Sequence, residues 1–136
     1  MNRRRETVVR PYAQVVGVVL LLLGVVGFLL VTQSPLLGLL NIDVVENIVH
    51  LLTGAARAYV GFALRDNATA RSVVGGIGVV YLLIGIVGFV APTLFGLLQN
   101  PYTVVDNIIH LALGALGVYI GFMGPGRDTV TTAGAR

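Results

Sequence analysis

The chain has 136 residues, of which 56% are hydrophobic and only 11% are charged. Because a soluble domain carries about 25% charged residues, this composition excludes an ordinary water-exposed surface and indicates an all-α integral membrane protein. The absence of cysteine excludes disulfides and thiolate metal sites. The net charge of +3 does not indicate nucleic acid as a partner, since much of the positive charge precedes the first apolar segment.

Four apolar segments follow one another, each close to the roughly 20 residues that a helix needs to cross about 30 Å of hydrocarbon. We expect membrane-spanning helices at about residues 13–32, 44–64, 73–91 and 104–123. The first segment exceeds the apolar part of an ordinary signal peptide, about 7–15 residues, and no clear cleavage site follows it. We therefore expect it to remain in the protein.

The arginines are unevenly distributed between the connections. The basic segment 1–11, the loop 65–72 and the tail 124–136 contain every arginine except Arg57. Because basic loops stay in the cytoplasm, we expect a multi-pass protein with both termini cytoplasmic. The connection after Ser34 has the N-cap and proline pattern of a short interfacial helix, with a re-entrant turn as the alternative.

The second half of the chain repeats the first. The segment GVVLLLLGVVGF from Gly17 matches GVVYLLIGIVGF from Gly78, and VVENIVHLLTG matches VVDNIIHLALG. Each repeat, 12–64 and 73–123, would cross the membrane twice, so both should have the same orientation about an axis along the membrane normal. The predicted fold is an all-α four-transmembrane-helix bundle made of two parallel-oriented helical-hairpin repeats.

The second span of each repeat carries an acid, an asparagine and one of the chain's two histidines. Polar side chains in spans face the bundle interior, because lipid cannot pair with them. The candidate polar-core residues are Glu46, Asn47, His50, Asp106, Asn107 and His110. The two acids also stand three residues after Asp43 and Thr103, a capping-box spacing that by itself explains them as helix starts.

Glycines recur at helical spacing on all four spans, and small residues let helix backbones approach closely. The candidate packing glycines are Gly17, Gly24, Gly54, Gly61, Gly78, Gly85, Gly114 and Gly121. On the second span of each repeat, the glycines share a face with the asparagine and the histidine. We therefore expect that face to form the contact between the two repeats.

Arg57 breaks the repeat, because its counterpart is Gly117. A charged residue at the centre of a span costs roughly 2.5–3.5 kcal/mol on insertion scales. Snorkelling of the long side chain toward the cytoplasm would reduce this cost. Alternatively, Arg57 contacts an anionic group such as a lipid phosphate or a cofactor carboxylate. Gly117 would leave room for it if the second spans face each other.

Paired spans in which the second opens with N-x-x-H-x-x-x-G resemble a prokaryotic family of small four-span membrane proteins, domain of unknown function 4383. The matching residues are Asn47, His50, Gly54, Asn107, His110 and Gly114, with Gly24, Gly27, Phe28, Gly85, Gly88 and Phe89. The resemblance covers about residues 12–123. It implies a four-helix membrane fold in a prokaryotic plasma membrane, and it supplies no activity.

Three functions fit these features. The first is a non-enzymatic structural or accessory subunit that packs against a larger membrane complex or against itself. The second is haem or metal binding, in which His50 and His110 supply axial imidazoles and Gly54 and Gly114 make space for the macrocycle. The third is transport of a proton, ion or small solute along the polar axis of the second spans.

Two further points limit these alternatives. Two histidines alone provide too few ligands for a metal site unless Glu46 and Asp106 join them. No resident cofactor is therefore expected. The chain lacks the G-x-S-x-G and H-E-x-x-H motifs and a phosphate-binding glycine loop. An enzyme is therefore not expected.

Overall fold

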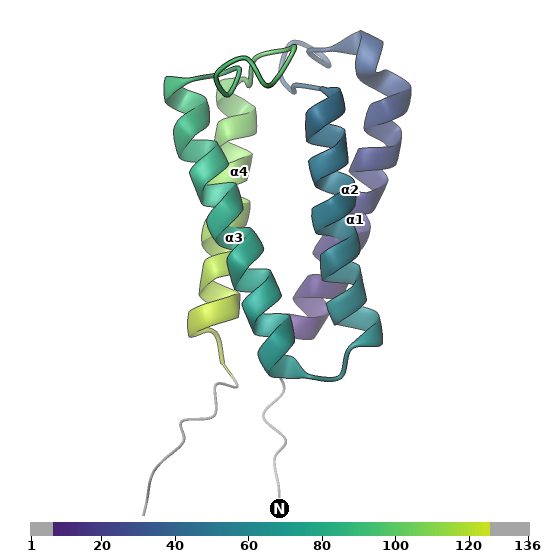
Figure 1. Ribbon diagram of the computed structural model, residues 1–136, viewed down its shortest axis with the longest axis vertical. Coiled ribbons are helices and arrows are strands. Elements are labelled where there is room, and N and C mark those ends of the chain that lie inside the picture. Colours follow the sequence, from purple (N-terminus) through teal and green to yellow (C-terminus); the bar gives the residue numbers. More distant parts are fainter. Residues whose placement is uncertain (1–6, 126–136) are drawn as a thin grey trace, which may run out of the picture.

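The computed structural model describes residues 7–125, which form four helices and no strand (Figure 1). The elements are α1 (Val9–Leu30), η1 (Val31–Gln33), α2 (Val44–Ala58), η2 (Tyr59–Ala63), α3 (Asn67–Val90), α4 (Val104–Val118) and η3 (Tyr119–Met123). η2 and η3 are π-helical continuations of α2 and α4. Most of the expected N-terminal segment 1–11 and of the tail 124–136 lies outside the described residues.

Three helical segments are long and apolar enough to cross a membrane, Val9–Gln33, Asn67–Val90 and Val104–Met123. The fourth helix, α2 continued by η2, has 15 and 5 residues and is less apolar. Its most strongly polar residues are Glu46, Asn47, His50 and Arg57. The side chains of all four are buried or nearly so, which means that the low hydropathy of α2 reflects an inward-facing polar surface.

Two of the helices begin earlier than expected. α1 begins at Val9, and α3 begins at Asn67. The expected loop 65–72 is therefore wrong, and only a short turn joins η2 to α3. The cause is a side-chain cap, because the Asp66 carboxylate accepts hydrogen bonds from the backbone N–H groups of Ala68 at 3.0 Å and Thr69 at 3.1 Å.

Residues 34–43 and 91–103 contain no helix, so the short helix expected after Ser34 is wrong. The Ser34 hydroxyl accepts a hydrogen bond from the Ile42 N–H at 3.0 Å and closes a tight loop. Leu37 and Gly38 have φ values of 54° and 70°, in the left-handed region that ends a right-handed helical path. Both connections lie at the same end of the molecule (Figure 1).

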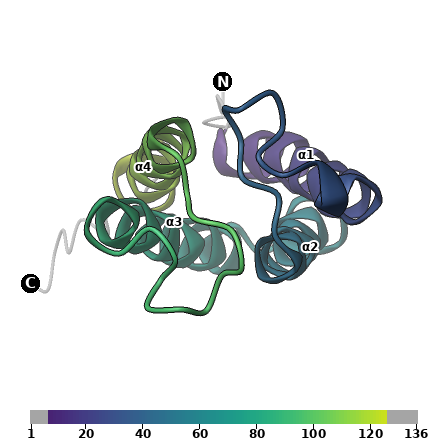
Figure 2. The same ribbon diagram turned by 90° about the horizontal axis from the view of Figure 1, so that it is seen from above.

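The helices form two close pairs, α1 with α2 and α3 with α4 (Figures 1 and 2). A methyl group added to Gly54 would lie 2.8 Å from the backbone nitrogen of Leu21, and one added to Gly114 would lie 2.5 Å from that of Leu82. Neither distance leaves room for a side chain. The other predicted packing glycines face a neighbour in their own pair in the same way: Gly17, Gly24, Gly61, Gly78, Gly85 and Gly121.

This arrangement corrects the predicted face of contact. The glycines of α2 and α4 pack inside each pair and not between the pairs. They also leave no free space beside Gly54 and Gly114, because the backbones of α1 and α3 already occupy it. The room predicted there for a flat macrocycle is therefore absent.

The two pairs meet mainly through α3, which lies against α1 and α2. At the end of the molecule where α1 begins, the contact is apolar and fully packed. Its buried residues are Val9, Ala13, Val60, Ala70, Val74 and Ile120.

Two arginines bind the ends of the π-helical turns. Arg10 donates to the carbonyl of Gly61 at 3.2 Å, and Arg71 donates to that of Ile120 at 3.1 Å. Backbone carbonyls at the C-terminal ends of η2 and η3 thus accept hydrogen bonds from a positively charged guanidinium.

We predict that Gly114→Ala destabilises the protein by about 1–3 kcal/mol, because the added methyl group must push the α3 backbone away. Gly76→Ala is the matched control, since Gly76 is a helical glycine with nothing within 4 Å of the added group. This control should leave stability unchanged or raise it by up to about 1 kcal/mol. Thermal unfolding in detergent measures both, and equal losses would contradict the proposed packing.

Candidate functional site

The two asparagines lie inside their own helix pairs. Asn47 and Asn107 are buried, and the Oδ1 atom of each would lie 2.0 Å from a methyl group added to Gly27 or Gly88 respectively. Each asparagine side chain therefore fills the space that a side chain at the facing glycine of the neighbouring helix would occupy. The expectation that both asparagines lie between the two halves is wrong, and their position makes them packing residues of α1–α2 and α3–α4.

The two histidines, in contrast, do approach each other across the two halves. His50 Nε2 lies 4.0 Å and His110 Nε2 lies 3.6 Å from the same carboxylate oxygen, Glu46 Oε1. One potential ligand atom from each of the three side chains lies within 4.8 Å of the others. We call Glu46, His50 and His110 the carboxylate–histidine cluster. The sequence predicted its members, and the structure adds that one carboxylate serves both imidazoles.

Glu46 takes part in the cluster because it does not cap its helix. The N-cap of α2 is Asp43, whose side chain accepts the Val45 N–H at 2.9 Å. Glu46 instead accepts a hydrogen bond from Asn41 Nδ2 at 3.1 Å through Oε2, which leaves Oε1 directed at the histidines. The capping box predicted for Asp43 and Glu46 is therefore wrong.

The capping box predicted for Thr103 and Asp106 is confirmed. The Thr103 N–H donates to Asp106 at 2.8 Å, and the Asp106 N–H donates to the Thr103 hydroxyl at 3.2 Å. Asp106 also accepts the backbone N–H of Asn41 from the other half, at 2.9 and 3.1 Å to its two oxygens. Asp106 is thus occupied as a helix start and a cross-link, and it is not a member of the cluster.

A second buried acid, Asp43, makes the equivalent cross-link from the first half to the second. Asp43 is 1% exposed and accepts the backbone N–H groups of Gln99 at 2.7 Å and Asn100 at 3.1 Å. Each half therefore holds, through one buried carboxylate, the segment that joins the two helices of the other half. We call these two segments, 34–43 and 91–103, the outer connections. Together the two links place the start of α2 beside the start of α4, which positions Glu46 opposite His110.

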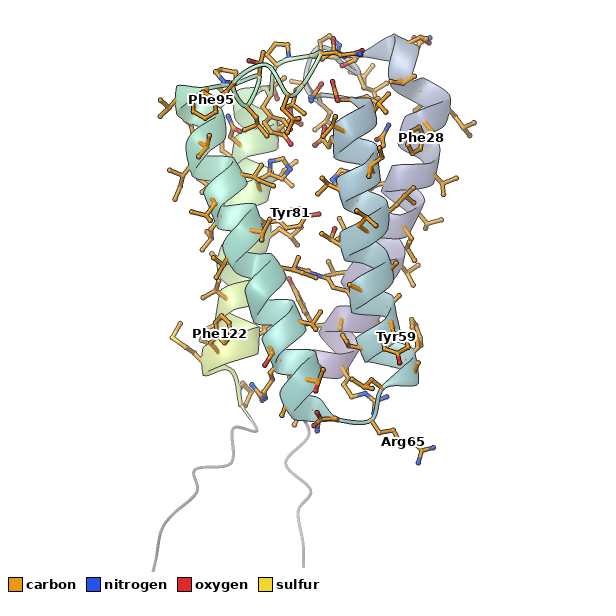
Figure 3. The ribbon with its side chains drawn as sticks, in the orientation of Figure 1. Phe28, Tyr59, Arg65, Tyr81, Phe95 and Phe122 are labelled. Carbon is orange, nitrogen blue, oxygen red and sulfur yellow. The ribbon has the colours of Figure 1, made fainter. Side chains whose placement is uncertain are left out.

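Two tyrosines form the walls around His110. The rings of Tyr81 and Tyr102 meet its imidazole edge-on, with centroid separations of 5.6 and 4.9 Å. Tyr81 projects from α3 into the space between the pairs (Figure 3), and its hydroxyl lies 2.9 Å from the Thr53 hydroxyl of α2. Burial raises the pKa of the Tyr102 phenol, so this residue remains neutral. The imidazole is therefore held by aromatic packing.

Arg57 lies deeper in the molecule than the cluster, and the expectation that it snorkels to the cytoplasmic side is wrong. Its side chain is fully buried. Its guanidinium donates to the Tyr12 hydroxyl at 3.2 Å and lies 5.4 Å from the Tyr12 ring and 5.8 Å from the Tyr81 ring. A methyl group on Gly117 would lie 3.4 Å from its Nη2 atom, an ordinary contact distance, so Arg57 lies beside Gly117 but does not by itself require a glycine there.

A cavity of about 430 Å³ opens beside the cluster between α1 and α4. This volume is in the range of about 300–1,000 Å³ that small-molecule pockets occupy. Its walls are apolar and include Val19 and Leu23 of α1 and Leu113 of α4, whereas Glu46, His50, His110 and Asp106 form a polar end. The cluster therefore faces a space that a further molecule can reach.

These features define a helical protein that carries a buried carboxylate–histidine cluster at the end of an apolar cavity. The chain belongs to the family described as Domain of unknown function (DUF4383), whose model matches residues 10–123. Neither the curated proteins nor the solved structures that were compared with the chain contain a match. The family assignment carries no activity, so the function has to be argued from the geometry.

We predict that Asp43→Ala destabilises the protein more than Asp66→Ala, although both remove the N-cap of a helix. Asp43→Ala also leaves two part-buried N–H groups of the other half without their acceptor, at up to about 1 kcal/mol each. Asp66 lies on an exposed turn, where water replaces its carboxylate. Chemical denaturation in detergent measures the difference, and equal losses would show that the cross-link contributes no stability.

Proposed function

We propose that this chain is a small integral membrane protein of four spans, with two hairpins of the same orientation and both termini in the cytoplasm of a prokaryote. Successive helices run in alternating directions, which supports an even number of crossings (Figure 1). Large apolar side chains are exposed on every helix, for example Leu29, Leu52, Leu83 and Ile108. Arg65 lies at the end opposite to the outer connections (Figure 3), where the positive-inside rule favours the cytoplasm.

We further propose that the protein acts by binding, as a structural or accessory subunit of a larger membrane complex, and not as an enzyme. The observation that carries this proposal is the open side of the bundle between α1 and α4. An acyl chain entering there would leave the polar end of the cavity without a partner. A polar side chain on a helix of another subunit could pair with it, as polar residues between membrane helices do.

The geometry gives less support to the two alternatives that involve haem or transport. The backbones packed against Gly54 and Gly114 leave no slot for haem beside these two glycines, where the sequence predicted one. A polar path from the cluster to the cytoplasmic end would have to pass Arg57 between Tyr12 and Tyr81. It would then meet the apolar contact that contains Val74 and Ile120.

Single-cysteine variants test the docking side, because the natural chain has no cysteine. Leu23 lines the cavity and Leu83 does not, although their exposed fractions are similar at 50% and 56%. We predict that a photo-crosslinker attached to Leu23→Cys in native membranes yields a discrete protein adduct, whereas the same reagent on Leu83→Cys does not. Equal adducts at both positions, or adducts with lipid only, would contradict the accessory role.

The orientation has its own test. Leu37 is 88% exposed in the outer connection, and Ala68 is an exposed small residue at the start of α3. We predict that a membrane-impermeant thiol reagent labels Leu37→Cys in intact cells, and that it labels Ala68→Cys only after the cells are lysed. The reverse pattern would show that the termini lie outside.

A further inference from the structure

We propose that Glu46, His50 and His110 bind one divalent first-row transition-metal ion, of the class that includes Zn²⁺ and Fe²⁺. This inference goes beyond the accessory role and does not depend on it. Two imidazole nitrogens and one carboxylate oxygen are a ligand set that both ions accept, with further positions left open.

The first argument is distance. The separations of 3.6 and 4.0 Å between Glu46 Oε1 and the two histidine Nε2 atoms are too long for direct hydrogen bonds. Bonds of about 2.0–2.2 Å in a tetrahedral zinc site hold the ligand atoms about 3.3–3.5 Å apart. The three atoms lie within 4.8 Å of one another, so the side chains would move inward to hold an ion.

The second argument is that the buried acid has no permanently charged partner among the described residues. Glu46 is 6% exposed, and within residues 7–125 the basic side chains within 4.0 Å of its carboxylate are the two histidines. Asp43 and Asp106 lie at the same end of the molecule, each accepting hydrogen bonds from the other half. No arginine among residues 7–125 lies within 4.0 Å of the Glu46 carboxylate, and Arg57 donates instead to Tyr12. A divalent cation bound beside Glu46 would stabilise its carboxylate, because carboxylate ligands bind a metal in the ionised form.

The third argument is that the ligands are already oriented. Glu46 and His50 are four residues apart on α2, so they share one face. Asn41 holds the other carboxylate oxygen, as outer-shell partners of metal ligands do. Tyr81 and Tyr102 hold the His110 ring, which is 5% exposed, so its Nε2 atom keeps its direction toward Glu46.

The cavity gives the bound ion an accessible side. Glu46, His50 and His110 all line it, so positions not taken by the protein would face the apolar space between α1 and α4. A metal with three protein ligands keeps such positions for water or for an incoming group. We therefore expect an exchangeable site that binds one ion per chain.

The test uses the full-length protein purified in detergent without chelators. We expect about one equivalent of zinc or iron by elemental analysis. After removal of the metal, we expect Zn²⁺ to rebind with a 1:1 stoichiometry and to raise the thermal midpoint, and Co²⁺ to produce visible d–d absorption bands. Elemental analysis of anaerobically purified protein separates iron from zinc.

Three variants decide whether the binding occurs at this cluster. Glu46→Gln keeps the shape of the side chain and removes its charge, and His110→Gln removes the imidazole. Each should weaken Zn²⁺ binding at least tenfold and abolish the Co²⁺ bands, while the metal-free thermal midpoint shows that the variant folds. Leu52→Ala is the control, since Leu52 lies on α2, is 67% exposed and does not line the cavity, and this variant should bind Zn²⁺ as the natural protein does.

Two results would overturn the proposal. One is natural protein that holds no stoichiometric metal and binds neither Zn²⁺ nor Co²⁺. The other is a folded Glu46→Gln variant that binds Zn²⁺ as tightly as the natural protein, which would place the ion at another site.

Discussion

The close approach of α1 to α2 and of α3 to α4 is the constraint on which the rest of the structure depends. Lipid is as apolar as leucine, so helices in a bilayer are held together by van der Waals contact and polar pairs. Glycines such as Gly54 and Gly114 allow backbone contact over a long stretch. Once one face of α2 and α4 is used in this way, only the adjacent face remains for the other half.

That adjacent face on α2 carries Glu46, His50, Thr53 and Arg57. At about 100° per residue these four residues form a stripe that is turned by roughly 60–120° from Asn47. Three of the four contact the second half, because Glu46 reaches His110, and Thr53 and Arg57 both meet Tyr81. His50 lines the same cavity as His110 of α4. The two halves are thus joined through a polar stripe of one helix, and the cluster is its outermost part.

The pattern of residues predicted several features correctly, including three of the four helices of membrane length, the family and the capping box at Thr103. Other features required tertiary contacts. A single helical wheel grouped Asn47 with His50, because their directions differ by only about 60°, yet one faces Gly27 and the other faces Glu46. The helix expected after Ser34 is not formed, because the Ser34 hydroxyl accepts a hydrogen bond from the Ile42 N–H and closes a loop instead. Such a contact between distant residues cannot be predicted from the capping pattern alone.

The sequence by itself determined that the chain is helical and apolar, and which polar residues it must place inside, because hydrogen-bonding groups in hydrocarbon cannot be left unpaired. Only the tertiary structure decided which of these residues meet. Glu46 and Asp106 hold equivalent positions, yet Asp106 closes a capping box while Glu46, one methylene longer and held by Asn41, reaches both histidines. That difference depends on where the outer connection of one half lies against the other, which spacing along a chain does not encode.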